Sequence, residues 1–365
     1  MARGANPAPA TGDAELDRLH GELSQAHVIP TWVFAPAIIG QAPAAGYRPH
    51  LWKWRRMHEL LMRAGELVTP ERGAERRSID HVNPDLVAHN ATSHTLATAF
   101  QLVRPGETAP AHRHTAGAVR FAARSRGGDV FTTVQGEKLV MERFDLVLTP
   151  KWMWHEHENR TGHDIIWLDA LDYPFVNLMR ASFFEPHAED RRHARRPPGY
   201  TGRRIGPVRP AGWDPYPEEA PLVRYGWTET RAALEGLRGE DGSPHDGVIL
   251  EYVNPFTSGP TLPTMSCRVQ LLREDEHTGC HRETASTIYY AMQGRGFTVV
   301  DGVRFDWGEG DVLVIPPWAW HEHASTHGEA YLFSVTDKPI LDTFGYYREE
   351  AGARQRVAAS FPAGD

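Results

Sequence analysis

The sequence predicts a mainly β-structured protein that contains two related barrels or sandwiches. The first observation is a series of short apolar segments separated by turn residues, beginning near Thr95, which is typical of small barrels or sandwiches. The second is an internal repeat, in which the residues around His112 recur around His281 and those around His155 recur around His321. The two offsets differ by only a few residues, so the repeat indicates a duplicated domain and not a solenoid.

Composition and pattern divide the chain into five segments. Two of them are expected to be β-structured, and a linker rich in Arg, Pro, Gly and Glu separates them. In order, the segments are an N-terminal helical and extended arm (1–94), the first barrel (95–177), the linker (178–247), the second barrel (248–345) and a C-terminal tail (346–365).

Helical periodicity and capping residues predict three short helices outside the barrels. Between the first two, a segment rich in proline and aromatic residues is expected to be extended. The predicted helices are 13–25, 51–65 and 228–237, and the extended segment is 30–49.

The composition is that of an ordinary globular protein, with 41% apolar and 24% charged residues among 365. A net charge of −8 argues against a nucleic-acid partner, and no apolar run is long enough to span a membrane. The first residues lack the order of a signal peptide. Cys267 and Cys280 cannot form a disulfide framework and are expected to be buried, so a cytoplasmic location is the default expectation.

Two histidines near the start of the second predicted strand point to a metal site. His112 and His114 are two residues apart, so on a strand their side chains share one face. His155 follows the turn at Pro150 and is the expected third ligand from a neighbouring strand. Neutral imidazoles suit Fe, Zn, Cu or Ni.

The spacing of these histidines resembles that of a known fold family. Gly106 to His114 fits Gly-x5-His-x-His, and Pro150 to Asn159 fits Pro-x4-His-x3-Asn, the two motifs of cupins. Cupins are jelly-roll barrels, so the resemblance implies a bicupin, dominated by β-structure, with two such barrels and an N-terminal helical and extended segment. The usual acidic ligand after the histidine pair is missing, because Ala118-Val-Arg120-Phe stands there. In lacking this acidic ligand, the chain resembles the gentisate 1,2-dioxygenase family, which includes salicylate and 1-hydroxy-2-naphthoate dioxygenases.

The resemblance implies a ring-cleaving dioxygenase that holds Fe(II) on His112, His114 and His155. Its partners would be O2 and a small aromatic hydroxy acid, cleaved between the carbons that carry the carboxyl and hydroxyl groups. Gentisate, which would give maleylpyruvate, is the leading substrate. The implied substrate contacts are Arg76, Gln101, Arg120 and His157, with Arg77 as the alternative to Arg76 if the register is shifted.

The residues themselves agree with two of these roles. Arg120 lies six residues after His114, on the same strand parity, and its planar fork suits a carboxylate. His157 shares the parity of His155 and could transfer a proton at the ring hydroxyl. Arg120 and His157 are therefore the expected catalytic residues.

Departures from the family pattern leave the substrate open. Ala97 stands where the salicylate-cleaving relative is expected to carry an aromatic residue, and Arg124 to Arg126 and Phe144 also depart from the pattern. Salicylate, a substituted salicylate or 1-hydroxy-2-naphthoate is the alternative substrate.

Two further hypotheses for the function are a non-catalytic bicupin that binds a small ligand or metal, and a cupin isomerase that uses Zn or Mn. A second metal site could form from His281, Glu283 and His321, since two imidazoles and a carboxylate make an iron-binding set. The resemblance also implies a homo-oligomer, commonly a tetramer.

Overall fold

The structure is a computed structural model that describes residues 10–44, 46–69, 72–73, 77–128, 130–188, 195–205, 210–211, 213 and 223–362, except for the side chains of 36–38. The chain forms two compact units, Met1–Ala44 and Ala45–Asp365. Within the described ranges, no helix is long and apolar enough to cross a membrane.

The first unit contains helices α1 (Ala14–Gln25) and α2 (Thr31–Ile38). The Asp13 carboxylate accepts hydrogen bonds from the N–H groups of Glu15 (2.9 Å) and Leu16 (3.1 Å), so it caps α1 as the sequence predicted. The extended conformation expected for 30–49 was wrong where α2 forms.

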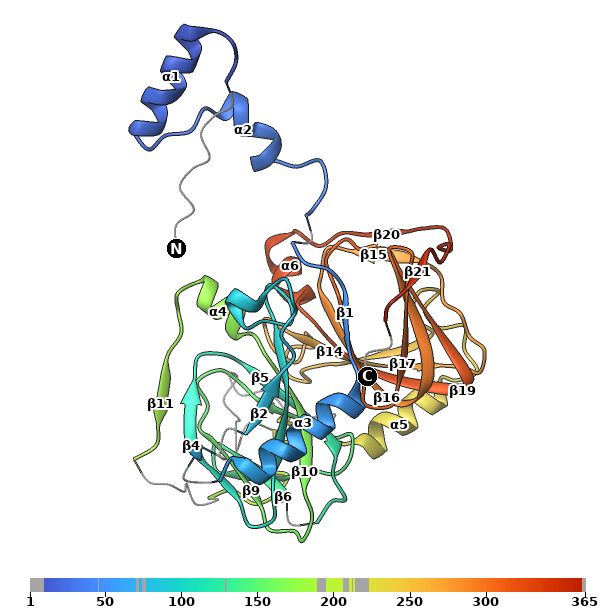
Figure 1. The fold of residues 1–365 in the computed structure, drawn as a ribbon. Helices are drawn as coiled ribbons and strands as arrows, with labels where there is room; N and C mark the ends of the chain where they lie inside the picture. The colour runs from blue at the N-terminus through green and yellow to red at the C-terminus, as the bar shows by residue number, and fades with distance from the viewer. Residues whose placement is uncertain are drawn as a thin grey trace. The chain divides into compact units, whose positions relative to one another are not determined.

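Two facing sheets of the second unit make the first barrel (Figure 1). One has the order β12-β8-β5-β10-β3-β2 and the other the order β11-β4-β9-β6-β7. Their strands are β2 (Ser78–Asp80), β3 (Ala97–Val103), β4 (Thr108–His114), β5 (Ala118–Arg124), β6 (Val130–Val134), β7 (Glu137–Val140), β8 (Leu146–Thr149), β9 (His155–Asn159), β10 (Ile165–Leu171), β11 (Phe184–Pro186) and β12 (Arg224–Tyr225). The short helices η3 (Val87–His89) and α4 (Tyr173–Leu178) flank them.

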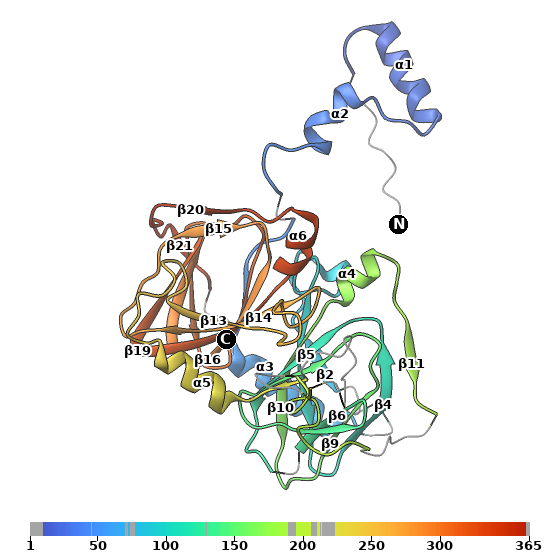
Figure 2. The same cartoon turned by 180° about the vertical axis from the view of Figure 1, so that it is seen from behind.

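The second barrel is built around two long strands, β16 and β19, which pair with each other along most of their length. The 10-stranded sheet also takes in the C-terminal strands β20 and β21. Its strands are β13 (Val248–Tyr252), β14 (Ser266–Leu272), β15 (His281–Glu283), β16 (Thr287–Val300), β17 (Val303–Gly308), β18 (Val312–Ile315), β19 (His321–Thr336), β20 (Glu349–Ala351) and β21 (Ala359–Ser360), with β1 (His50–Trp52) at one edge. Helices α5 (Trp227–Gly236) and α6 (Lys338–Phe344) complete the region, and α5 contacts β13 (Figure 2).

One apolar core runs through both barrels. The rings of Phe121 on β5 and Phe333 on β19 stack with centroids 4.1 Å apart and planes 14° from parallel. Tyr290 on β16 meets Phe121 edge-on at 5.8 Å. Buried aromatic contacts of this kind stabilise the interface beyond the area they remove from water, so the barrels pack as one body.

The helix expected at 51–65 begins three residues later and ends two residues later, as α3 (Trp54–Leu67). Leu51 belongs to β1 and pairs with Leu313 of the second barrel. The Asp311 carboxylate accepts the N–H of Trp54 at 2.7 Å, so a residue distant in sequence fixes the start of α3. Gly65 does not end the helix; a Cβ there would lie 2.8 Å from the Leu102 side chain, so glycine permits the close approach of α3 to β3.

Other expectations about the fold were confirmed. The barrels are β-dominated, the linker helix forms at α5, and Cys267 and Cys280 are both buried free thiols.

Candidate active site

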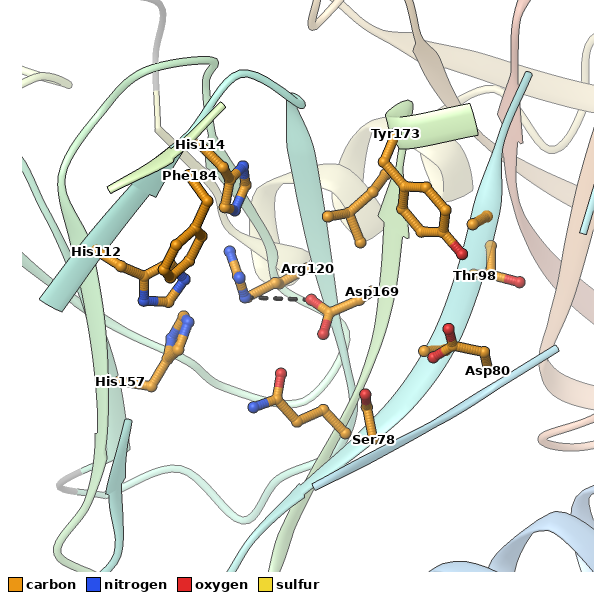
Figure 3. Close-up of a pocket in the computed structure, with 14 residues that line it drawn as sticks. Ser78, Asp80, Thr98, His112, His114, Arg120, His157, Asp169, Tyr173 and Phe184 are labelled. Carbon is orange, nitrogen blue, oxygen red and sulfur yellow. Dashed lines mark ion pairs between the residues drawn. The ribbon is translucent and has the colours of Figure 1, made fainter. Parts of the chain in front are cut away.

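A cavity of about 440 Å³ opens between the two sheets of the first barrel. The sequence prediction had placed five of its lining residues in or beside the site: His112, His114, Arg120, Gln101 and His157. The departure at Ala97 also lines it. Figure 3 shows the imidazoles of His112, His114 and His157 at one end of the cavity and Asp80, Thr98 and Tyr173 at the other.

Three imidazoles meet at the first end. His112 and His114 come from β4, and His155 begins β9, directly opposite His112 in the strand register. One ligand atom of each residue lies within 4.8 Å of the corresponding atoms of the other two. The alternation of side chains along β4 and the pairing of β4 with β9 therefore place the three expected ligands close together.

The same hydrogen bond fixes the tautomer of each ring. The Nδ1 atoms of His112, His114 and His155 face the carbonyl oxygens of Pro110 (2.8 Å), Ala116 (2.7 Å) and Met153 (2.9 Å). A carbonyl oxygen only accepts, so each Nδ1 carries the proton and each Nε2 keeps its lone pair. Metal-binding histidines are oriented in this way, so the donor set fits a divalent cation that prefers imidazole.

Burial keeps the third ring neutral. Desolvation lowers the pKa of His155 well below its usual value, and the positive charge of Arg120 lowers it further. Its Nε2 has no hydrogen-bond partner among the described residues. A buried nitrogen of this kind is satisfied by a cation as well as by water.

A cation–π clamp holds the two ligand-bearing segments together. The Arg113 guanidinium, between the two β4 histidines, lies 4.5 Å from the ring centroid of Trp152 and 4.6 Å from that of Trp154. Both tryptophans precede His155, so the contact fixes the turn before β9 against β4.

Arg120 on β5 reaches the cavity within a buried polar network. Its Nε lies 3.1 Å from Oδ1 of Asp169, its cross-strand neighbour on β10, and its Nη1 donates to Thr149 Oγ1 at 2.6 Å. Burial lowers the pKa of Arg120 and raises that of Asp169 to about 6, although Arg120 opposes the second shift. The network orients the guanidinium toward the end of the cavity where the imidazoles converge (Figure 3).

His157 lies on the inner face of β9, two residues after His155. Its Nδ1 bonds to Thr132 Oγ1 at 2.8 Å, and its ring packs 5.1 Å from that of Trp167. Burial and the charge of Arg120 lower its pKa well below the usual value. Its Nε2 has no hydrogen-bond partner in the described part of the chain, so the nitrogen can meet a ligand in the cavity.

The remaining expected contacts have different outcomes. Gln101 lines the cavity from β3. Arg76 lies outside the described residues. Arg77, the alternative, is buried away from the cavity lining, where it binds Glu107 and the Val68 carbonyl oxygen (2.8 Å).

The second barrel does not repeat the convergence. Glu283 Oε1 accepts from Thr287 (3.0 Å) and its Oε2 accepts from Tyr347 (3.0 Å). In the described part of the chain, His281, Glu283 and His321 do not form a set of mutually close donors like that of the first barrel.

Sequence reasoning missed several polar residues of the cavity. Asp169 is an isolated acid in the apolar strand β10, which is a signal that could have been read. Thr132 and Thr149 do not line the cavity but bond to His157 and Arg120, and they gave no signal, because threonine is common in strands. The other lining residues not anticipated are Ser78, Asp80, Thr98, Ala99, Leu171, Tyr173 and Phe184.

The fold and this cavity define a class of protein. The model of the cupin domain family matches the chain twice, at residues 99–171 and 268–336. The protein is therefore a bicupin, with a three-histidine site in its first barrel.

Known proteins similar over nearly the whole chain narrow the class. A 5-aminosalicylate 1,2-dioxygenase from Comamonas sp is 54% identical over 97% of this chain and 96% of the relative. A 1-hydroxy-2-naphthoate 1,2-dioxygenase from Nocardioides sp. (strain KP7) is 38% identical over 87% of this chain and 82% of the relative. The crystal structure of a salicylate 1,2-dioxygenase from Pseudoaminobacter salicylatoxidans, in its adduct with gentisate, superposes with a TM-score of 0.85 at 31% identity, covering 97% of this chain and 98% of the other.

The chain belongs to the gentisate and salicylate 1,2-dioxygenase family, and it is a ring-cleaving dioxygenase. Enzymes of this class place both atoms of O2 in one product.

Proposed function

We propose that the protein binds Fe(II) through His112, His114 and His155 and cleaves a 2-hydroxybenzoate between the carbons that bear its carboxyl and hydroxyl groups. The observation that carries the proposal is the convergence of three Nε2 lone pairs beside a buried arginine in a 440 Å³ cavity. Three neutral ligands leave the metal its full double charge, which favours a dianionic chelating acid.

When bound, the iron supplies a site at which O2 and the aromatic acid are brought together and electrons can pass between them. The protein supplies orientation and proton transfer. Arg120 holds the substrate carboxylate through its fork, and Asp169 fixes the guanidinium in place. His157 takes the proton of the ring hydroxyl on Nε2, since its Nδ1 is held by Thr132.

The overall reaction breaks one ring carbon–carbon bond and adds both oxygen atoms of O2 to the two carbons released. No other oxidant is needed, because O2 is the electron acceptor. Gentisate and 5-aminosalicylate are the leading substrates we propose. We include 5-aminosalicylate because the relative that is 54% identical is a 5-aminosalicylate 1,2-dioxygenase.

Oxygen consumption on iron-loaded protein tests this function. The apoprotein is loaded anaerobically with Fe(II), its iron is measured, and O2 uptake is followed with gentisate, 5-aminosalicylate, salicylate and 1-hydroxy-2-naphthoate. We expect uptake that depends on iron and equals the substrate consumed. Full iron occupancy without uptake for any of these acids would contradict the proposal, as would activity carried by zinc or manganese alone.

We also propose a reducing, cytoplasmic setting and assembly into a homo-oligomer, commonly a tetramer in this family. The two buried free thiols support the first. Exposed apolar side chains support the second: the rings of Trp152 and Phe183 lie 6.3 Å apart on the surface, and Leu178 and Met179 are also exposed. The mass in solution, measured by light scattering, tests the assembly.

A further inference from the structure

The cavity differs in chemistry between its two ends. His112, His114 and His157 stand at one end (Figure 3). At the other end lie Asp80, the last residue of β2, and the Thr98 and Tyr173 side chains. A flat ring that binds at the histidines therefore presents its far edge to a different set of groups.

Most polar groups at the far end already have partners. Thr98 Oγ1 bonds to His81 Nδ1 and to Thr92 Oγ1, both at 3.1 Å. The Tyr173 hydroxyl donates to the Asn90 carbonyl oxygen. These groups have little hydrogen-bonding capacity left for a ligand.

Midway along the cavity, Asp169 is also engaged. It pairs with Arg120 and accepts the Trp167 indole N–H at 3.0 Å. Its carboxylate is needed to hold the guanidinium, so it is poorly placed to read a second feature of the ligand.

Asp80 is different. Its carboxylate makes no hydrogen bond or ion pair with any side chain in the described part of the chain, although it lines the cavity. Asp80 is an exposed residue at the end of β2, and desolvation by the protein around it still raises the pKa of its carboxyl. Its negative charge raises the pKa of Asp169 and of Tyr173, which places it electrostatically within the site.

The geometry of the ligand shows what would meet this carboxylate. A 2-hydroxybenzoate that chelates a metal places its carboxyl and hydroxyl groups at the histidine end. The substituent para to the hydroxyl is then the ring position farthest from the chelated hydroxyl oxygen, and it projects toward the far end. A carboxylate accepts a hydrogen bond from an amino or hydroxyl group there, whereas a nitro group brings only acceptors to meet it.

We propose that Asp80 is a specificity-determining residue that accepts a hydrogen bond from an amino or hydroxyl substituent para to the ring hydroxyl of the substrate. The inference rests on the proposed function and narrows its substrate class to 2-hydroxybenzoates with a donor at position 5. Ala97 and Ala99, which also line the cavity, leave room for that substituent. A carboxylate at this position favours an acid that carries a donor over an analogue that lacks one.

Substrate selectivity tests the assignment. The values of kcat and KM are measured for 5-aminosalicylate, gentisate, salicylate and 5-nitrosalicylate on the iron-loaded wild type, Asp80→Ala and Asp80→Asn. We expect Asp80→Ala to lower the kcat/KM ratio of 5-aminosalicylate to salicylate at least tenfold, chiefly through KM. Asp80→Asn keeps an acceptor oxygen but adds an N–H donor, so it should retain part of that preference and raise the relative rate on 5-nitrosalicylate.

Asp306→Asn is the matched control. Asp306 is an exposed carboxylate on β17 of the second barrel, paired with Arg304 at 2.6 Å, and its substitution should leave the ratio unchanged. Anaerobic calorimetry of the same acids gives a readout of binding that is independent of turnover.

Two failures are distinguishable. A ratio that stays within threefold of wild type in Asp80→Ala overturns the role of Asp80 while the dioxygenase function stands. Absence of both O2 uptake and binding for every acid overturns the proposed function, and the role of Asp80 with it.

Discussion

The two barrels share one framework for holding a pair of histidines. In the first barrel, His112 on β4 is paired with His155 on β9. In the second barrel, His281 on β15 is paired with His321 on β19 in the same way. The Nδ1 atoms of His155 and His321 bond to carbonyl oxygens two residues earlier, at 2.9 and 3.0 Å. The residue three before each of these two histidines, a tryptophan, has the same left-handed φ, 61° and 62°.

The barrels differ at the positions that would complete a catalytic centre. Where the first has the imidazole of His114, the second has Glu283, which Thr287 and Tyr347 already engage. The cross-strand pair formed by Arg120 and Asp169 in the first barrel corresponds to Tyr289 and Ser334 in the second. The C-terminal strand β20 also pairs with β15, and its residue Glu349 binds His281 Nδ1 at 3.0 Å. The shared scaffold therefore positions two histidines in each barrel. The first barrel adds a third imidazole and a buried arginine, and the second barrel has neither at the matching positions.

The largest expected effect concerns metal retention. His155→Ala should abolish iron binding and activity, because it removes one of three ligands, whereas the matched His321→Ala should retain both. Iron per chain, measured together with O2 uptake, decides this, and circular dichroism controls for folding. We expect one iron per chain in the wild type; two irons, or equal losses in both variants, would make the barrels equivalent and break the comparison.

The next effect concerns the cation. Arg120→Ala should raise KM and lower kcat, reducing kcat/KM about 100-fold, because roughly 3 kcal/mol of charge-assisted hydrogen bonding to the carboxylate is lost. It should also lower stability by roughly 3–5 kcal/mol, since Asp169 is left buried without its partner. Steady-state kinetics and denaturant unfolding measure the two effects.

Tyr289→Phe in the second barrel is the matched control and should leave the kinetics unaltered. Arg120→Lys, which keeps the charge but loses the fork, should recover only part of the activity. Wild-type kinetics in Arg120→Ala with a native fold would remove Arg120 from the site.

The smallest expected effect concerns a hydrogen bond that both barrels share. Thr132 bonds to His157 at 2.8 Å and Thr298 bonds to His323 at 2.9 Å, and each pair is buried. Thr→Val at either position leaves a buried imidazole Nδ1 without its hydrogen-bond partner, so each variant should lose about 1–3 kcal/mol of stability. Only Thr132→Val should also lower kcat, by several-fold, with a changed pH profile; a similar kinetic effect of Thr298→Val would contradict the division of labour.

The sequence predicted the parts of the site that follow local periodicity. His112 and His114 share a face because strands alternate, and the repeat located both His155 and its counterpart His321. The same reasoning placed Arg120 in the cavity. Its partner Asp169 could not be assigned, because cross-strand pairing depends on register and a bulge lies in β10 beside it.

Tertiary contacts also decided the features of the fold that sequence reasoning misplaced. The start of α3 depends on Asp311, which no local capping rule could identify. The fate of Glu283 was similarly hidden, since its partner Tyr347 comes from beyond the second barrel's last long strand. Both repeats have the spacing of a metal site, but in the second repeat the Glu283 carboxylate is already hydrogen-bonded to Thr287 and Tyr347.

The pairing of β1 with β18 has a consequence for biosynthesis. Residues 50–52 leave the ribosome early, yet their partner, residues 312–315, is made only after the whole first barrel and most of the second. The backbone of β1 therefore lacks its hydrogen-bonded partner strand until β18 has been synthesised. Completion of the first barrel therefore does not complete β1, which gains its ladder only after residues 312–315 have left the ribosome.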